Sequence, residues 1–384
     1  MRWYRLVPGA LLIGLAVLLL AGVGTSVMVS REPAPWDTAP VRPEPAPDPA
    51  PDPAPDPAPD PAPAPVTLVP YDGPVEHIFF HPLIVYPELA FDGDGLSGGY
   101  DDWFVTIKEF NRIIDSLYRS NYILVDYGAL FADSADGGLE HKPLALPPGK
   151  KPLILSIDDL NYYQYMRENG NAYKLIVDTD GRIKTYSLNP AGEPVISAEN
   201  EIVPIVDEFV RRHSDFSLNG AKGVIALTGY EGILGYRTND PSAPGYAQDV
   251  RDALAVAKRL KETGWSFASH GWGHLDAVKI SPDSLARDTR RWKAEVEPLT
   301  GPTPIYIYPF GAAAARGDEK LKILRDHGFR ILAGVGPNPF LDLQDGYVLT
   351  ERRHIDGFAF REQRQQLLPF FDANEVIDEI RPAR

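Results

Sequence analysis

Apolar and polar residues follow two different periods from about residue 70 onward. Short apolar runs at His77–Tyr86, Tyr122–Asp126 and Pro152–Ser156 predict buried strands. Between them, Thr106 and Glu109 form a capping-box pattern ahead of apolar residues at helical spacing, which predicts a helix. The first part of this region therefore reads as strand, helix, strand and strand.

The same alternation continues toward the C-terminus. Further strands are expected at 223–228, 265–268, 304–308, 330–334 and 347–350, and helices at 201–213, 248–263, from 281 and at 319–327. The run 173–187, with Asp180-Gly181 at its turn, predicts a hairpin inserted into this series. Strands that alternate with helices predict an α/β fold with a largely parallel sheet or barrel.

The beginning of the chain has a different pattern. An uncharged, mostly apolar run from Val7 to Val29 follows Arg2 and Arg5, which predicts a membrane-spanning helix with the rest of the protein exported. A cleaved signal peptide, giving a secreted protein, is the alternative. We therefore assign residues 1–30 to a membrane anchor or signal segment.

A proline-rich stretch comes next. Pro33 to Pro65 is dominated by a P-A-P-D repeat, which cannot bury a core and favours extended polyproline II. At about 3.1 Å per residue it reaches on the order of 100 Å. We expect residues 31–70 to be a disordered spacer, stiff or merely a passive tether, and residues 71–384 to form the folded domain.

Composition narrows the chemistry. The chain has no cysteine, so disulfides and thiolate metal sites are excluded, and a bound metal must use His, Asp or Glu. The formal net charge of -15 argues against nucleic acid as a partner.

Polar groups gather where predicted strands end. These groups are Asp158-Asp159, the pair His270 and His274, the run Tyr308-Pro309-Phe310-Gly311, and His354. Active sites of β/α barrels lie at that rim. Two histidines four residues apart would share one face of a helix, and with a carboxylate they make three protein ligands of a catalytic zinc site that keeps a fourth position open. Taken singly, each group could also be an ordinary polar loop residue or a helix cap.

Three of these segments resemble motifs of the polysaccharide deacetylases, also called the NodB-homology domain or carbohydrate esterase family four. The segments are "LSIDDLNYY", "SHGWGH" and "YIYPFGA". The resemblance covers about residues 75–360, with a long insertion between the first two motifs. It implies a distorted (β/α) barrel and a bound divalent metal, most often Zn²⁺.

The resemblance also implies roles. It makes Asp159, His270 and His274 the metal ligands and Asp158 the general base, which would activate a metal-bound water to attack an acetyl carbonyl. A backbone N–H near Phe310 would stabilise the oxyanion. The family uses a late histidine as proton donor, which implies His354 here.

The chain departs from the family pattern in three places. Ile307 stands where the family has the arginine that orients the base, Leu160 where glycine is usual, and Glu351 where leucine is usual. Another cation would then have to position Asp158, and the candidates are Arg352, Arg353 and Arg237.

Several further residues allow two interpretations. Trp272 and Tyr308 offer flat faces for sugar rings, with Pro309 and Phe310 beside them, or they simply pack the rim. A rim role for His77 and His81 is possible, although core or surface positions are the usual reading of such histidines. Residues 93–102 are expected to form a flexible loop.

The sequence thus predicts a membrane-anchored, extracytoplasmic, metal-dependent deacetylase of an N-acetylated cell-wall or exported polysaccharide. Two alternatives stay open: a catalytically impaired, carbohydrate-binding relative, and a structural envelope protein on a proline-rich stalk.

Overall fold

The structure, a computed structural model, describes residues 67–135 and 137–383. The predicted membrane anchor and nearly all of the predicted spacer lie outside these residues. Within them, no helix combines the length and the apolar character needed to cross a bilayer. The first strand, β1 (Val69–Tyr71), begins inside the segment that was predicted to be spacer.

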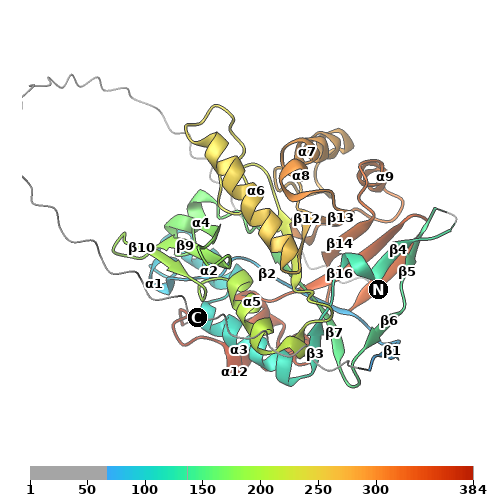
Figure 1. Ribbon diagram of the computed structural model, residues 1–384, viewed down its shortest axis with the longest axis horizontal. Helices are drawn as coiled ribbons and strands as arrows, with labels where there is room; N and C mark the ends of the chain where they lie inside the picture. Colours follow the sequence, from blue (N-terminus) through green and yellow to red (C-terminus); the bar gives the residue numbers. More distant parts are fainter. Residues whose placement is uncertain (1–66, 136, 384) are drawn as a thin grey trace, which may run out of the picture. The chain divides into compact units, whose positions relative to one another are not determined.

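Seven parallel strands form a closed barrel (Figure 1). In order around the ring they are β11 (Gly223–Leu227), β12 (Trp265–Ser269), β13 (Ile305–Ile307), β14 (Ile331–Val335), β16 (Tyr347–His354), β2 (Glu76–Phe80) and β7 (Lys151–Asp158). The ring closes because β7 pairs with β2 along one edge and with β11 along the other. The predicted α/β barrel is confirmed.

Five longer helices cover the barrel. They are α3 (Ile107–Arg119), α5 (Ile202–Arg212), α6 (Tyr246–Glu262), α7 (Pro282–Glu295) and α9 (Glu319–Asp326). The predicted capping box of α3 is present, since Thr106 and Glu109 each accept a backbone N–H of the other residue. Ser281 caps α7 ahead of Pro282, as its sequence predicts.

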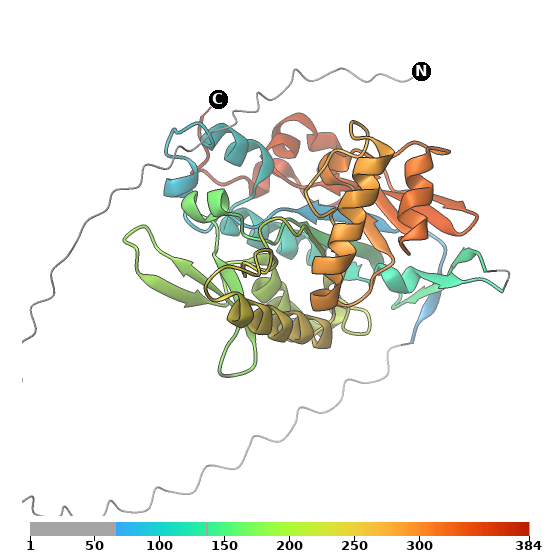
Figure 2. The ribbon, with the colours of Figure 1, turned by 90° about the horizontal axis from the view of Figure 1, so that it is seen from above.

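The remaining elements are short or lie outside the ring. They are β3 (Tyr122–Leu124), β4 (Phe131–Asp133), β5 (Leu139–His141), β6 (Leu144–Leu146), β15 (Phe340–Gln344), α1 (Pro87–Ala90), α2 (Ser97–Trp103), α4 (Gln164–Glu168), α8 (Glu297–Thr300), α10 (Gly357–Glu362), α11 (Arg364–Leu367) and α12 (Ala373–Val376). The predicted hairpin is an antiparallel sheet of three strands, β8 (Lys174–Val177), β9 (Ile183–Leu188) and β10 (Pro194–Ser197), and it projects beside α6 (Figure 2).

One expectation is wrong. Residues 93–102 are not a flexible loop, because α2 begins at Ser97. The reason is local: the Asp94 carboxylate accepts hydrogen bonds from the backbone N–H groups of Leu96 and Ser97 at 2.8 and 2.9 Å, which order the turn that leads into the helix.

Side chains along the barrel strands point alternately into the ring and toward the helix layer. Ile154 on β7 and Ile307 on β13 belong to the small apolar cluster inside the ring, whereas Leu155 and Tyr306 belong to the large cluster under the helices. Residues two positions apart on a strand face the same way. Side chains with inward parity at the carboxyl ends of the strands therefore converge over the mouth of the barrel.

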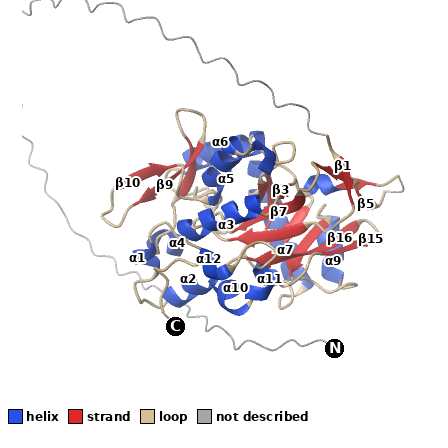
Figure 3. Cartoon of the chain, turned by 90° about the horizontal axis from the view of Figure 1, so that it is seen from below, coloured by secondary structure: helices blue, strands red, loops and turns tan. Residues whose placement is uncertain are grey.

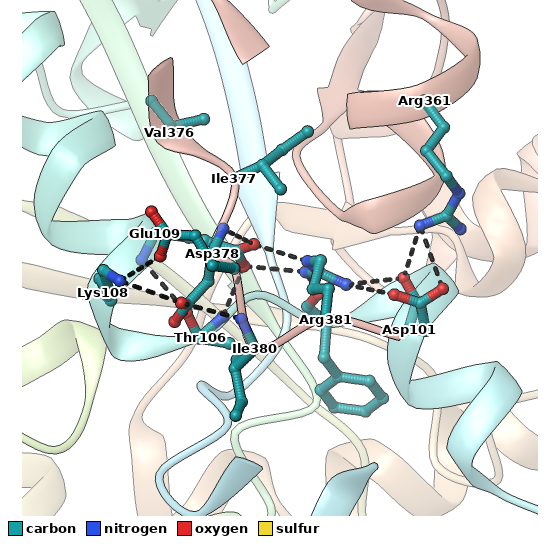
Figure 4. Close-up of polar contacts among 12 residues, drawn as sticks. Asp101, Thr106, Lys108, Glu109, Arg361, Val376, Ile377, Asp378, Ile380 and Arg381 are labelled. Carbon is teal, nitrogen blue, oxygen red and sulfur yellow. Dashed lines mark hydrogen bonds and ion pairs between the residues drawn. The ribbon is translucent and has the colours of Figure 1, made fainter. Parts of the chain in front are cut away.

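The C-terminal segment is fixed by buried ion pairs. Helices α1, α2, α10 and α12 gather on one side of the domain (Figure 3). There Arg381 pairs with Glu109 at 2.5 Å and with Asp101 at 3.0 Å, and the side chains of the two acids are almost fully buried (Figure 4). These pairs tie the end of the described chain to α2 and α3.

Candidate metal centre

The two adjacent aspartates lie at the mouth of the barrel. Asp158 is the last residue of β7, and Asp159 follows with a left-handed φ of 59°. The N–H of Asp159 donates to the carbonyl of Ala226 on β11 at 3.1 Å. This bond holds the turn that points both carboxylates, which are 3% and 5% exposed, toward the same space.

The two histidines lie on a loop after β12 and not on a helix, so the prediction that they share one face of a helix is wrong. Gly271 and His274 adopt φ values of 68° and 52°, which turn the chain back on itself. Asp288 on α7 holds this loop, because its carboxylate accepts the N–H groups of Trp272 and Gly273, each at 2.7 Å.

The predicted convergence of the three ligands is present. Asp159, His270 and His274 each offer one ligand atom, and these atoms lie within 4.8 Å of one another. The Nε2 of His274 is 3.5 Å from Oδ2 of Asp159. Metal bonds of about 2.0–2.2 Å in tetrahedral geometry hold donors roughly 3.4 Å apart, so shifts of less than about 1 Å suffice for one ion to reach all three.

The tautomer of His270 also suits a metal. Its Nδ1 lies 2.8 Å from the carbonyl oxygen of Ile307, and since a carbonyl only accepts, Nδ1 carries the proton and Nε2 keeps its lone pair. Burial lowers the pKa of His270, which keeps the ring neutral. Ile307, which occupies the position of the family's arginine, thus contributes its backbone.

Tyr163 fixes the carboxylate ligand. Its hydroxyl donates to Oδ1 of Asp159 at 2.6 Å and lies 2.6 Å from the hydroxyl of Thr228, from which it can accept. Burial alone would raise the pKa of Asp159, but His274, His270 and the Tyr163 hydrogen bond lower it. The donor set of one carboxylate and two imidazoles, oriented from behind, fits a zinc-like ion.

Arg352 supplies the missing cation. Its guanidinium forms a bidentate ion pair with Asp158 at 2.7 and 2.9 Å and also donates to Ser156 at 3.1 Å. Burial would raise the pKa of Asp158, but Arg352 and then His270 lower it to about 2. The side chain of Arg352 is completely buried, so this pair is shielded from solvent.

The other two candidate arginines are engaged elsewhere. Arg353 pairs with Glu76 at 2.8 Å, and Arg237 donates to the carbonyl oxygens of Glu231 and Tyr162. Leu160, which replaces the usual glycine, is fully buried in the core.

The residues expected to hold sugar rings differ in exposure. Tyr308 is fully buried and packs edge-on against Tyr306, so the expectation that it stacks on a sugar is wrong for this conformation. The two tyrosines are two positions apart along the chain, so both side chains face the helix layer. Pro309 is buried as well, whereas Phe310 is 69% exposed and its ring lies 4.4 Å from that of His274.

Trp272 is largely covered by its neighbours. Its indole N–H donates to Glu295 at 2.7 Å, and the guanidinium of Arg291 lies 3.2 Å from the centre of the ring. Both partners are on α7. The geometry therefore fits anchoring of the histidine loop better than stacking on a substrate.

Two histidines compete for the role of proton donor. Both ring nitrogens of His354 have partners, Asp356 at 2.7 Å and Gln363 at 3.1 Å. His81 instead uses Nδ1 for the carbonyl of Trp103 at 3.1 Å and has Nε2 left. The ring of His81 lies 6.0 Å from that of Phe79, which packs against the guanidinium of Arg352, the partner of Asp158.

Three site residues have strained backbones. Asp159, His274 and Phe310 all have φ between 52° and 59°, the left-handed region that residues other than glycine rarely adopt. Each of them lies at the mouth of the barrel.

Comparison with known proteins gives the following matches. Residues 245–332 match the family model described as polysaccharide deacetylase, a segment that contains both site histidines. A deacetylase of Streptococcus pyogenes in complex with acetate aligns at 14% identity over 79% of this chain and 99% of that chain, with a TM-score of 0.44. A de-N-acetylase of Aggregatibacter actinomycetemcomitans aligns at 13% identity over 78% and 100%, also at 0.44. A CE4 family pseudoenzyme of Bacillus anthracis aligns at 13% identity over 44% and 54%, with a TM-score of 0.25. No curated protein sequence matches the chain.

Proposed function

We propose that this chain, a member of the polysaccharide deacetylase family by its residues 245–332, is a metal-dependent hydrolase that removes acetyl groups from an N-acetylated polysaccharide. The observation that carries the proposal is the convergence of Asp159, His270 and His274, from two distant parts of the sequence, beside the Arg352-paired carboxylate of Asp158. These three residues would hold a divalent ion, and their donor set of one carboxylate and two imidazoles suits zinc. When bound, such an ion acidifies water and polarises an acyl carbonyl.

The protein's own groups then have separate tasks. Asp158 accepts a proton at its carboxylate, which Arg352 keeps ionised and oriented. The pKa of about 2 makes this carboxylate a weak base, so its contribution rests mainly on position. Ile307 and Tyr163 orient two of the ligands from behind.

Proton donation to the leaving amine is assigned to His81 in preference to His354. His81 lies just past the end of β2, beside the Phe79 ring that packs against Arg352, and because its Nδ1–H is bound to a carbonyl, Nε2 is the atom left to deliver a proton. Both ring nitrogens of His354 are hydrogen-bonded, to Asp356 and Gln363. Its ring centre lies 6.2 Å from that of Phe79, and Phe79 packs against the guanidinium of Arg352.

The substrate and location extend the same proposal. The membrane anchor, proline-rich spacer and folded domain expected from the sequence would place the barrel outside the cytoplasm, where bacterial cell-wall and exported glycans are found. An N-acetylated glycan is the substrate class that the family resemblance implies.

The test measures metal content and acetate release together. Purified protein should retain about one equivalent of zinc and release acetate from N-acetylglucosamine oligomers or peptidoglycan. Asp158→Asn should keep the metal and lose most activity, whereas His274→Gln should lose both. A protein that retains no divalent metal from buffers containing zinc would contradict the proposal, as would an Asp158→Asn variant with full activity.

A further inference from the structure

Trp103 is a large apolar side chain exposed close to the metal centre. It ends α2 and is 48% exposed. Single exposed apolar residues are common on protein surfaces, so exposure alone indicates nothing. Two further observations, its backing and its connection to His81, give Trp103 a more specific meaning.

The indole ring is held rigidly from behind. Phe358 stacks on it with centroids 5.8 Å apart and planes 24° apart, and His354 stacks on Phe358 in turn at 6.0 Å and 23°. His354 is itself fixed by its hydrogen bonds to Asp356 and Gln363. This column of three rings presents the remaining face of Trp103 at little cost in side-chain entropy on binding.

The column is joined to the metal centre. The carbonyl oxygen of Trp103 accepts the Nδ1–H of His81, whose ring lies 6.0 Å from that of Phe79. Phe79 in turn packs against the guanidinium of Arg352, the ion-pair partner of Asp158. A second exposed ring, Phe310, lies next to the ligand His274. Exposed aromatic rings from two separate elements are thus attached directly to residues of the site.

Charged groups that can bind hydroxyls lie on the same two helices as the stacked rings. Asp102, which precedes Trp103 on α2, forms an ion pair with Arg361, which follows Phe358 by three residues on α10 and also lies 3.2 Å from Asp101. A flat apolar ring beside planar charged groups matches a pyranose, which has one face of C–H groups and a rim of hydroxyls.

We propose that Trp103, backed by Phe358, is a stacking subsite for a sugar ring adjacent to the sugar that is deacetylated. This inference rests on the proposed function and deepens it, because the enzyme then binds at least two neighbouring sugars of a polymer. Asp102 and Arg361 bind the hydroxyls of the stacked sugar.

The test compares a single sugar with an oligomer. N-acetylglucosamine itself and its pentamers, in β-1,4 and β-1,6 linkage, are titrated by calorimetry into the zinc-loaded full chain carrying Asp158→Asn, so that hydrolysis does not interfere. Adding Trp103→Ala should weaken pentamer binding about tenfold and binding of the single sugar far less. Trp103→Phe should recover most of the loss, and Phe340→Ala, which removes an exposed ring from β15, should change neither.

Catalysis gives a second readout on the protein with Asp158 intact. Trp103→Ala should raise KM for the pentamer about tenfold with kcat nearly unchanged. Equal binding of the pentamer with and without the indole overturns the inference, as does failure to bind any of these oligomers. If Trp103-dependent binding is found but no acetate is released, the subsite stands and the proposed hydrolysis fails.

Discussion

Replacing Arg352 with methionine should show how much of the barrel's unfolding free energy depends on the buried ion pair between Arg352 and Asp158. The substitution keeps much of the side-chain volume and removes the charge, so Asp158 is left as a buried carboxylate without its bidentate partner. Breaking a buried pair from one side costs about 3–5 kcal/mol of unfolding free energy, because the other charge loses its compensation.

The pKa of Asp158 gives an independent magnitude. At about 2 in the folded protein, against an ordinary value of 3.8, the ionised carboxylate favours folding by about 2 kcal/mol at neutral pH. Because the folded pKa is the lower one, this contribution is present above pH ~4 and is lost as the pH falls toward 2. In Arg352→Met, burial without the guanidinium should instead raise the pKa of Asp158 above 3.8, so stability should rise with falling pH as the carboxyl is protonated.

The assay is urea unfolding followed by circular dichroism, with a chelator present so that bound metal contributes nothing. Arg353→Met is the matched control, since Arg353 is also buried on β16 but pairs with Glu76, away from the site. Both variants should lose stability, but only Arg352→Met should have its loss reduced by adding Asp158→Asn. A loss below about 1 kcal/mol, or the same benefit from Asp158→Asn in both backgrounds, would refute the reasoning.

Three further substitutions test other parts of the domain. Tyr163→Phe removes the hydrogen bond to the carboxylate ligand and should weaken zinc binding by about 10- to 100-fold in a chelator competition, whereas Tyr165→Phe, which changes only a stacked neighbour, should not. His81→Gln should lower kcat by about 100-fold or more, and His354→Gln should lower it far less; the opposite pattern would return the proton donor to position 354. Burial raises the pKa of Glu201 to about 8, so its ionisation costs stability as the pH rises from about 4.5 to 8; Glu201→Gln should flatten that decline in thermal denaturation, and an unchanged slope would contradict the assignment.

Much of the architecture could be predicted because it depends on local patterns. The strand–helix alternation, the α3 capping box and the Ser281 cap follow from residues near each other in the chain. The convergence of Asp159 with the two histidines could be expected because the carboxyl ends of barrel strands meet at one rim. The path of the histidine loop could not, since it depends on contacts with Asp288 on a later helix.

The alternation of side-chain directions along each strand separates candidate residues that the sequence motifs alone left equivalent. Val348 on β16 faces the barrel interior, so Arg352 shares its direction and Arg353 does not, which separates the two candidate arginines. The same count on β2, where Ile78 and Phe80 face the helices, gives His81 an inward direction. Tyr308 shares the outward parity of Tyr306, which would have excluded it as a sugar platform.

The left-handed backbone at Asp159, His274 and Phe310 has a consequence for how such a domain evolves. Each of these angles opposes folding by about 1–3 kcal/mol, and the surrounding barrel must supply that stability. Glycine adopts these angles without strain, so it would stabilise each turn while removing the side chain there. In a descendant no longer selected for the reaction, drift would therefore replace the functional side chains at these positions and keep the turns.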